Sequence, residues 1–119
     1  MKLTLPGFLL RLEGAVVFAS AAFLYGRNSG SWLLFALLIL APDLAALGYL
    51  AGARVGSVTY NIVHTYALPA SLMLAAWLSH APLGLSLALI WFAHIGADRL
   101  LGFGLKYPTE FKDTHLNRV

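Results

Sequence analysis

The sequence predicts an all-α integral membrane protein, a four-helix bundle with short loops and a short C-terminal interfacial segment. Of its 119 residues, 60% are hydrophobic and only 11% are charged, whereas about 25% of residues are charged in a typical soluble domain. The chain also contains four apolar stretches of about 20 residues, the length that crosses a bilayer as a helix. So apolar a chain has too few charges for a water-facing surface and would not stay disordered.

Short segments rich in glycine or polar residues separate the four predicted spans. Pro82 is expected to begin the fourth span, because proline is favoured in the first turn of a helix. Four spans use most of the chain, so the connections are short and sequence neighbours run antiparallel. Residues 1–105 form this bundle, with spans at residues 6–25, 31–50, 57–79 and 82–105, and residues 106–119 form a tail with a predicted interfacial helix.

A cleavable signal peptide is a competing interpretation of the first 25 residues. Arg11 and Glu13 argue against it, because they interrupt the apolar run that such a peptide needs. The absence of cysteine excludes disulfides, thiolate metal sites and cysteine nucleophiles.

The basic residues outside the spans predict the topology. An even number of spans places both termini and the second loop on one side, where five Lys and Arg residues collect, against Arg27 alone on the other side. Basic residues are enriched in cytoplasmic loops, so we expect both termini in the cytoplasm. These charges are too scattered to form the basic stripe of a nucleic-acid-binding protein. The expected partners are membrane lipids and a second copy of the chain, because four helices enclose little interior and leave Gly and Ala faces open to packing.

Seven ionisable residues lie inside the predicted spans, where each is costly and is therefore a candidate functional residue. Counted from the cytoplasmic ends, at about 1.5 Å per residue, five of them lie at depths of roughly 10 to 17 Å. We therefore expect the four helices to bring polar groups together in the cytoplasmic half of the bilayer. The seven residues are Arg11, Glu13, Asp43, His64, His94, Asp98 and Arg99.

Helical spacing predicts which of these groups meet. His94 and Asp98 are four residues apart and share a face, with Trp91 on the same stripe. Pro42 and Pro69 each leave a backbone carbonyl one turn earlier without its helical donor. Such carbonyls are tolerated in a membrane only where protein or water satisfies them. The spans are therefore expected to enclose a polar interior in which the indole N–H of Trp91 also finds a partner.

Several motifs carry a resemblance to a known family. They are HIGADRLLGFGLKYPTEFKDTHL from His94 to Leu116, LRLEG near the start, PDLAALGY in the second span and YNIVHTYALP in the third. Together they resemble a small family of bacterial four-helix membrane proteins that is classified as a domain of unknown function. The resemblance covers essentially the whole chain. It implies an integral protein of the bacterial cytoplasmic (inner) membrane, and it implies no activity, substrate or cofactor.

The leading functional interpretation is a metal-dependent enzyme or binder that acts on a lipid or amphiphile headgroup. In this interpretation His64, His94 and Asp98 are the ligands of a divalent transition metal. Asp43 or Glu13 is the general base or a further ligand. Arg99 binds an anionic headgroup.

Three alternatives remain open from the sequence. The polar residues form a structural network in which two arginines pair with three carboxylates, in a scaffold or interaction protein. Alternatively, His64 and His94 are the axial ligands of a haem. In the last alternative the carboxylates and histidines form the relay of a proton-coupled transporter, although the outer halves of the spans offer no polar path.

Overall fold

A computed structural model describes residues 4–28, 30–106, 108 and 114–118. The described residues are helical apart from loops and one isolated bridge between Lys106 and Thr114. This confirms the predicted all-α class. The helices are α1 (Leu5–Arg27), α2 (Trp32–Leu38), the 3₁₀ helix η1 (Ala41–Ala51), α3 (Ala53–Val63), α4 (Ala67–Leu78), α5 (Pro82–Leu101) and α6 (His115–Arg118).

Three segments are long and apolar enough to cross a membrane. They are Leu5–Arg27, Trp32–Ala51 and Pro82–Leu101. Large apolar side chains cover their outer faces, and Leu33 and Leu37 are each 69% exposed. Such a surface is unfavourable in water and suits a lipid environment.

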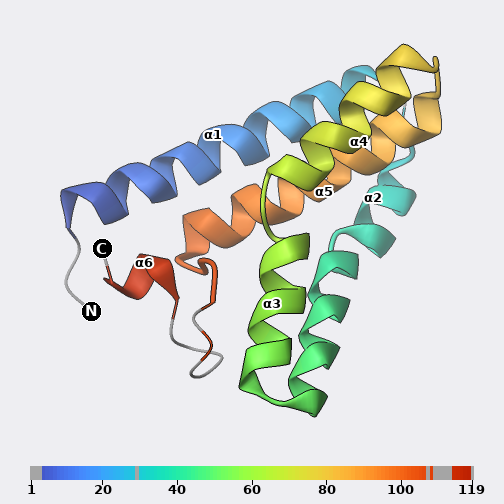
Figure 1. The fold of residues 1–119 in the computed structure, drawn as a ribbon. Helices are drawn as coiled ribbons and strands as arrows, with labels where there is room; N and C mark the ends of the chain where they lie inside the picture. The colour runs from blue at the N-terminus through green and yellow to red at the C-terminus, as the bar shows by residue number, and fades with distance from the viewer. Residues whose placement is uncertain (1–3, 29, 107, 109–113, 119) are drawn as a thin grey trace.

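The long helices α1 and α5 lie side by side and form the central helix pair of the fold (Figure 1). They meet at Gly14 and Gly96, where a Cβ on Gly96 would lie 2.7 Å from the Gly14 carbonyl oxygen. Only glycine lets two helix backbones approach this closely. On the other side of α5, α4 packs against its N-terminal half.

Local sequence signals set the ends of these helices. The Thr4 side chain caps α1 by accepting a hydrogen bond from the Gly7 amide at 3.1 Å. α5 begins at Pro82, as predicted, and ends at Gly102, whose φ of 96° is the left-handed conformation that favours glycine. The amide of Phe103 then donates to the Asp98 carbonyl at 2.7 Å. This cap holds Asp98 and Arg99 in the last turns of a well-defined helix.

The second and third predicted spans are both interrupted. Residues 31–50 form α2 and then η1, with a break at Ile39 and Leu40, and residues 57–79 fall on α3 and α4, with a break at residues 64–66. Proline explains the first break, because Pro42 cannot donate to the Leu38 carbonyl and the chain tightens into a 3₁₀ helix. Each interrupted span therefore differs from the continuous helix that its apolar length predicted.

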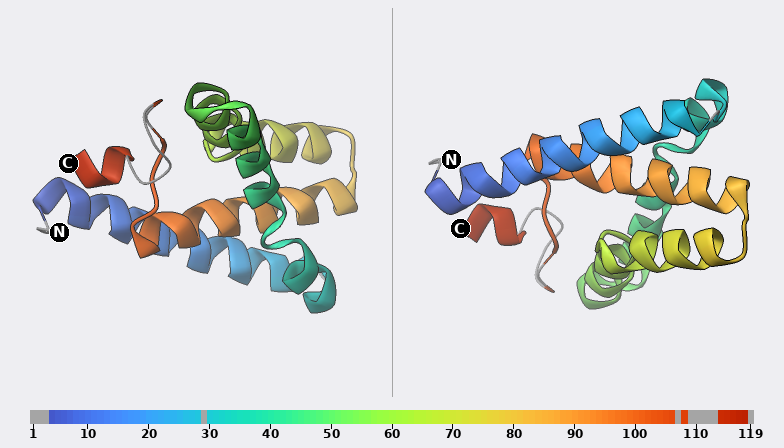
Figure 2. Two further views of the ribbon diagram at one scale, coloured as in Figure 1. Left: turned by 90° about the horizontal axis from the view of Figure 1, so that it is seen from below. Right: turned by 90° about the horizontal axis from the view of Figure 1, so that it is seen from above.

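The 3₁₀ helix η1 and α3 form a hairpin that runs away from the α1–α5 pair (Figures 1 and 2). A Cβ on Gly56 would overlap the Tyr49 ring, so this glycine lets the two arms pack closely. Gly52 forms the turn between them with a φ of 113°. The four predicted segments thus pair as α1 with α5, α4 with α5 and η1 with α3, and their axes are not all aligned.

A small core holds α1, α2 and α5 together beside the first break. Its buried residues are Ala21, Tyr25, Leu89, Ile90 and Ala93. The Tyr25 hydroxyl donates to the Ser31 carbonyl at 2.5 Å, so its polar end is satisfied. This core fixes the α2 end, and with it the break at Ile39, against the middle of α5.

Candidate metal centre

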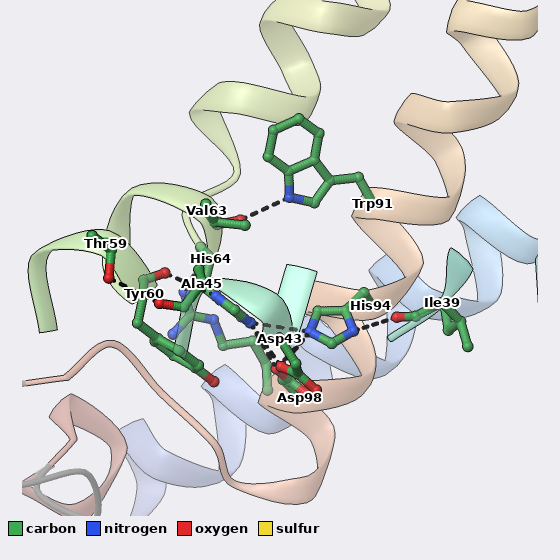
Figure 3. A network of polar contacts seen from close by, with 11 residues as sticks. Ile39, Asp43, Ala45, Thr59, Tyr60, Val63, His64, Trp91, His94 and Asp98 are labelled. Atoms are coloured by element: carbon green, nitrogen blue, oxygen red, sulfur yellow. Dashed lines mark hydrogen bonds and ion pairs between the residues drawn. The ribbon is translucent and has the colours of Figure 1, made fainter. Parts of the chain in front are cut away.

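Four of the predicted site residues come together where the two helix breaks meet α5 (Figure 3). Asp43 lies in the first turn of η1, His64 follows the last residue of α3, and His94 and Asp98 are one turn apart on α5. One ligand atom from each residue lies within 4.8 Å of the others. Three segments that are distant in the sequence thus contribute to one cluster.

Five separations within this cluster are close to those between the ligand atoms of a tetrahedral metal site, and all four atoms lie within 4.8 Å of one another. Nε2 of His64 and Nε2 of His94 are 3.0 Å apart. Asp43 Oδ1 lies 3.2 and 3.1 Å from these two nitrogens, and Asp98 Oδ2 lies 3.5 and 3.2 Å from them. Zinc with ligands at about 2.0–2.1 Å in a tetrahedron requires ligand separations of about 3.3–3.4 Å. The five measured separations fall on both sides of this value.

Backbone carbonyls fix the protonation of both imidazoles. Nδ1 of His64 lies 2.8 Å from the Tyr60 carbonyl oxygen, and Nδ1 of His94 lies 2.5 Å from that of Ile39. A carbonyl only accepts, so each Nδ1 carries a proton and each ring turns Nε2 into the cluster, where the neutral ring offers a lone pair. Histidine ligands of metals are usually oriented by an acceptor that binds the N–H of their other ring nitrogen.

The cluster therefore presents four acceptor atoms to one another. Asp98 Oδ2 is buried and makes no hydrogen bond. Two imidazole lone pairs 3.0 Å apart and two carboxylate oxygens repel one another unless a cation or a shared proton lies between them. The donor set of two nitrogens and two oxygens suits a divalent transition metal.

The side chains of α5 satisfy the carbonyls that the helix breaks release. His94 binds the Ile39 carbonyl at the first break. At the second break, Trp91 Nε1 donates to the Val63 carbonyl at 2.7 Å, and Arg99 Nη2 donates to the His64 carbonyl at 3.1 Å. Trp91 thus has the internal partner that the sequence predicts. The helix α5 therefore contacts the backbone at both breaks and also carries His94 and Asp98 of the cluster.

Access to the cluster is uneven. The side chains of His64 and His94 are 4% and 3% exposed, Asp98 is 18% exposed and Asp43 is 48% exposed. A cleft of about 290 Å³ opens on the carboxylate side, lined by Asp43, Ala46, Tyr60, Asp98 and Phe103. Three of the four ligand groups are therefore held in the interior, and Asp43 borders the cleft.

A family model described as a domain of unknown function (DUF4260) matches residues 8–119. The chain belongs to this family. The match confirms the resemblance that the motifs carry, and it covers every member of the cluster. Comparison with curated proteins and with solved structures gives no match. A functional proposal for this DUF4260 chain therefore rests on the geometry of the cluster.

Two predicted site residues of the DUF4260 chain lie outside the cluster. Glu13 is on the exposed face of α1. Arg99 is buried on the face of α5 next to that of Asp98, and its Nη1 lies 3.4 and 3.3 Å from the two ring nitrogens of His115. Arg99 thus donates a hydrogen bond to the His64 carbonyl and does not line the cleft.

The contacts of the carboxylates also bear on two alternatives. Asp43 and Asp98 meet imidazoles, and the guanidinium of Arg99 contacts a carbonyl and an imidazole. This differs from the network of arginine–carboxylate pairs considered above. With 3.0 Å between their Nε2 atoms, His64 and His94 are too close to bind opposite faces of a haem.

Three residues beside the cluster were not singled out as site residues by the sequence. The Tyr60 ring stacks on His64 with 3.7 Å between ring centroids, a contact that their spacing of four residues could have indicated. Asn61 exchanges two hydrogen bonds with the backbone of Lys106, at 2.7 and 2.6 Å. The Lys106 ammonium lies 4.6 Å from the Tyr60 ring centroid, and burial lowers its pKa. Only the fold brings Lys106 to this place.

The tail docks behind the cluster. His115 Nδ1 accepts a hydrogen bond from the Leu105 amide at 2.8 Å, and Leu116 is buried. Burial and the adjacent Arg99 charge lower the pKa of His115. The helix α6 covers the end of the predicted interfacial segment, whereas residues 109–113 of that segment lie outside the described residues.

Proposed function

We propose that this protein is a metal-dependent hydrolase of the bacterial inner membrane, with one divalent transition metal ion, zinc by preference, in the cluster. The carrying observation is the convergence of two imidazole nitrogens and two carboxylate oxygens within 4.8 Å of one another, with both Nδ1 atoms held by carbonyls. Nitrogen and oxygen ligands in this geometry suit zinc. The apolar helices support a substrate drawn from the membrane, a lipid or amphiphile that reacts at its headgroup.

The four side chains of the cluster differ in solvent exposure, and this difference assigns their roles. His64, His94 and Asp98 are the protein ligands, because their side chains are the least accessible. Catalytic zinc sites keep three protein ligands and leave the fourth position to water. Asp43, at the edge of the cleft, is the general base that exchanges with this water at the metal.

The proposed reaction is a metal-assisted hydrolysis. A zinc ion held by these residues would lower the pKa of a coordinated water to about 7. This water gives a proton to Asp43, and its oxygen bonds to the carbonyl carbon or phosphorus of the substrate. The bond to the leaving group then breaks, and the leaving group departs with the proton from Asp43.

Metal binding is the first test of this proposal. Zinc titrated into metal-depleted, detergent-purified protein is expected to bind at one ion per chain. H64A and H94A should weaken zinc binding by more than the roughly 10- to 100-fold that follows from losing a hydrogen-bond partner of a ligand. H80A is the matched control, because His80 is an exposed histidine before α5. Absence of stoichiometric zinc, or an equal loss in H80A, would contradict the proposal.

A second arm separates an enzyme from a metal binder. D43N keeps an oxygen near the metal and removes the base, so zinc should still bind while hydrolysis of a chromogenic p-nitrophenyl ester falls by about 100-fold or more. E13Q is the control, since Glu13 lies outside the cluster. Equal ester hydrolysis in D43N and the unmodified protein would contradict the role of Asp43 as general base. The protein would then be shown only to bind metal.

A further inference from the structure

A second cleft lies beside the ligands. It has a volume of about 350 Å³ and is lined by Leu38, Ala41, Pro42, Val63, Leu87, Ile90 and Trp91. This volume is within the range of small-molecule sites, about 300–1,000 Å³. The lining side chains are apolar, and the indole N–H of Trp91 is already bonded to the Val63 carbonyl. The cleft therefore suits hydrocarbon.

Asp43 and Asp98 line the polar cleft, and His94 lies between the residues of α5 that line the two clefts. Along α5, the apolar cleft uses residues up to Trp91, before His94, and the polar cleft begins at Asp98. Along η1, the apolar cleft uses Ala41 and Pro42, and the polar cleft begins at Asp43. Trp91 and Asp98 are seven residues apart, about 10 Å along the helix axis.

We infer that the apolar cleft binds the hydrocarbon chain of an amphiphilic substrate whose polar head occupies the polar cleft. The bond at the junction of chain and head then lies over His64, His94 and Asp98. This inference rests on the proposed function and names its substrate class. A chain drawn from the bilayer moves between two apolar environments, so the chain adds orientation at the reacting bond without a desolvation cost.

The first experiment tests, without metal, whether the apolar cleft binds a hydrocarbon chain. In W32F/W77F protein, Trp91 is the remaining tryptophan, and a decyl maltoside brominated at its chain end serves as the quencher. We expect saturable quenching of Trp91. A41F fills the cleft, so the saturable part of the quenching should be lost. A70F is the matched control, because Ala70 lines a separate apolar cleft, and it should leave quenching unchanged.

The alignment of chain and head is tested with zinc-loaded protein. Decanoyl hydroxamate is expected to bind at least about tenfold more tightly than acetohydroxamate in the unmodified protein. A41F should remove this difference while the affinities for acetohydroxamate and zinc stay unchanged. An unchanged zinc affinity shows that the centre of A41F is intact.

The outcomes separate the two proposals. Quenching that rises linearly with probe, or equal effects of A41F and A70F, overturns the chain site and indicates ordinary lipid solvation. Equal affinities for the two hydroxamates overturn the alignment. If zinc does not bind to the unmodified protein, the proposed hydrolase fails, whereas the quenching experiment still decides whether the cleft holds a chain.

Discussion

At the scale of single residues, the chemistry of the cluster depends on which imidazole nitrogen carries the proton. His64 and His94 each place Nδ1 on a backbone carbonyl at a helix break or in the turn before it. This leaves both Nε2 lone pairs for a cation. The breaks are therefore part of the site, because a continuous helix would use the Ile39 carbonyl internally.

Trp91 gives a residue-scale test of this arrangement. W91F removes the donor to the Val63 carbonyl and keeps an aromatic ring. A carbonyl left without a donor in apolar surroundings costs about 1–3 kcal/mol, so the free energy of unfolding in detergent should fall by about this amount. W77F is the control, since Trp77 is 66% exposed, and its effect should stay within about 0.5 kcal/mol. Similar losses in both variants would show that the Trp91–Val63 bond has no special role.

At the scale of elements, proline and glycine direct each segment to its place. Pro42 turns the chain into η1 and brings Asp43 to α5, and Gly14 against Gly96 fixes α5 on α1. The same contact explains the position of Glu13. Gly14 faces α5, and the adjacent residue points about 100° away around the helix. Apolar residues lie on nearly every face of α1, so its sequence does not show which face packs against α5.

The tail supplies an element-scale prediction on pH. Burial and Arg99 lower the pKa of docked His115, so the released tail binds a proton more readily than the docked tail. Docking is therefore complete above the ordinary histidine pKa of about 6.5 and weakens as the pH falls below it. The chain has no cysteine, so L116C reports release through its rate of maleimide labelling.

R54C, at an exposed position in the first turn of α3, corrects this rate for the pH dependence of the thiol itself. The ratio of the L116C rate to the R54C rate should rise between about pH 8 and about pH 5. In H115Q, which cannot take up this proton, the ratio should stay flat. A flat ratio with His115 in place would disprove coupling of docking to His115.

At the scale of the whole molecule, the described ends of the chain lie at the same end of the α1–α5 pair (Figures 1 and 2). This arrangement fits the proposed topology, in which both termini are cytoplasmic. The α3–α4 segment is the element to test, because its break leaves neither helix among the three long apolar ones.

Single cysteines test the topology. An impermeant maleimide should label R27C and H80C in intact cells, and R54C only after permeabilisation, because an even number of crossings puts the second loop inside. All three positions are exposed. Labelling of H80C only after permeabilisation would mean that α3 and α4 do not cross together.

The sequence by itself determined the all-α class and the family, because composition and the length of apolar runs follow directly from the order of residues. It also gave a polar set that contains Asp43, His64, His94 and Asp98, since each is an ionisable group at similar depth in an apolar stretch. It could have separated Arg99 from this set, because residues adjacent in a helix do not share a face.

Only the tertiary structure decided where the helices break and which polar groups converge. The distances among Asp43, His64 and the α5 pair depend on how three segments pack, and spacing along the chain does not contain that information. The same holds for the carbonyls that fix each imidazole and for the two clefts beside the ligands. Packing of glycine against glycine, the proline-induced break before η1 and the break at residues 64–66 convert a list of polar residues into four candidate ligand atoms around one point.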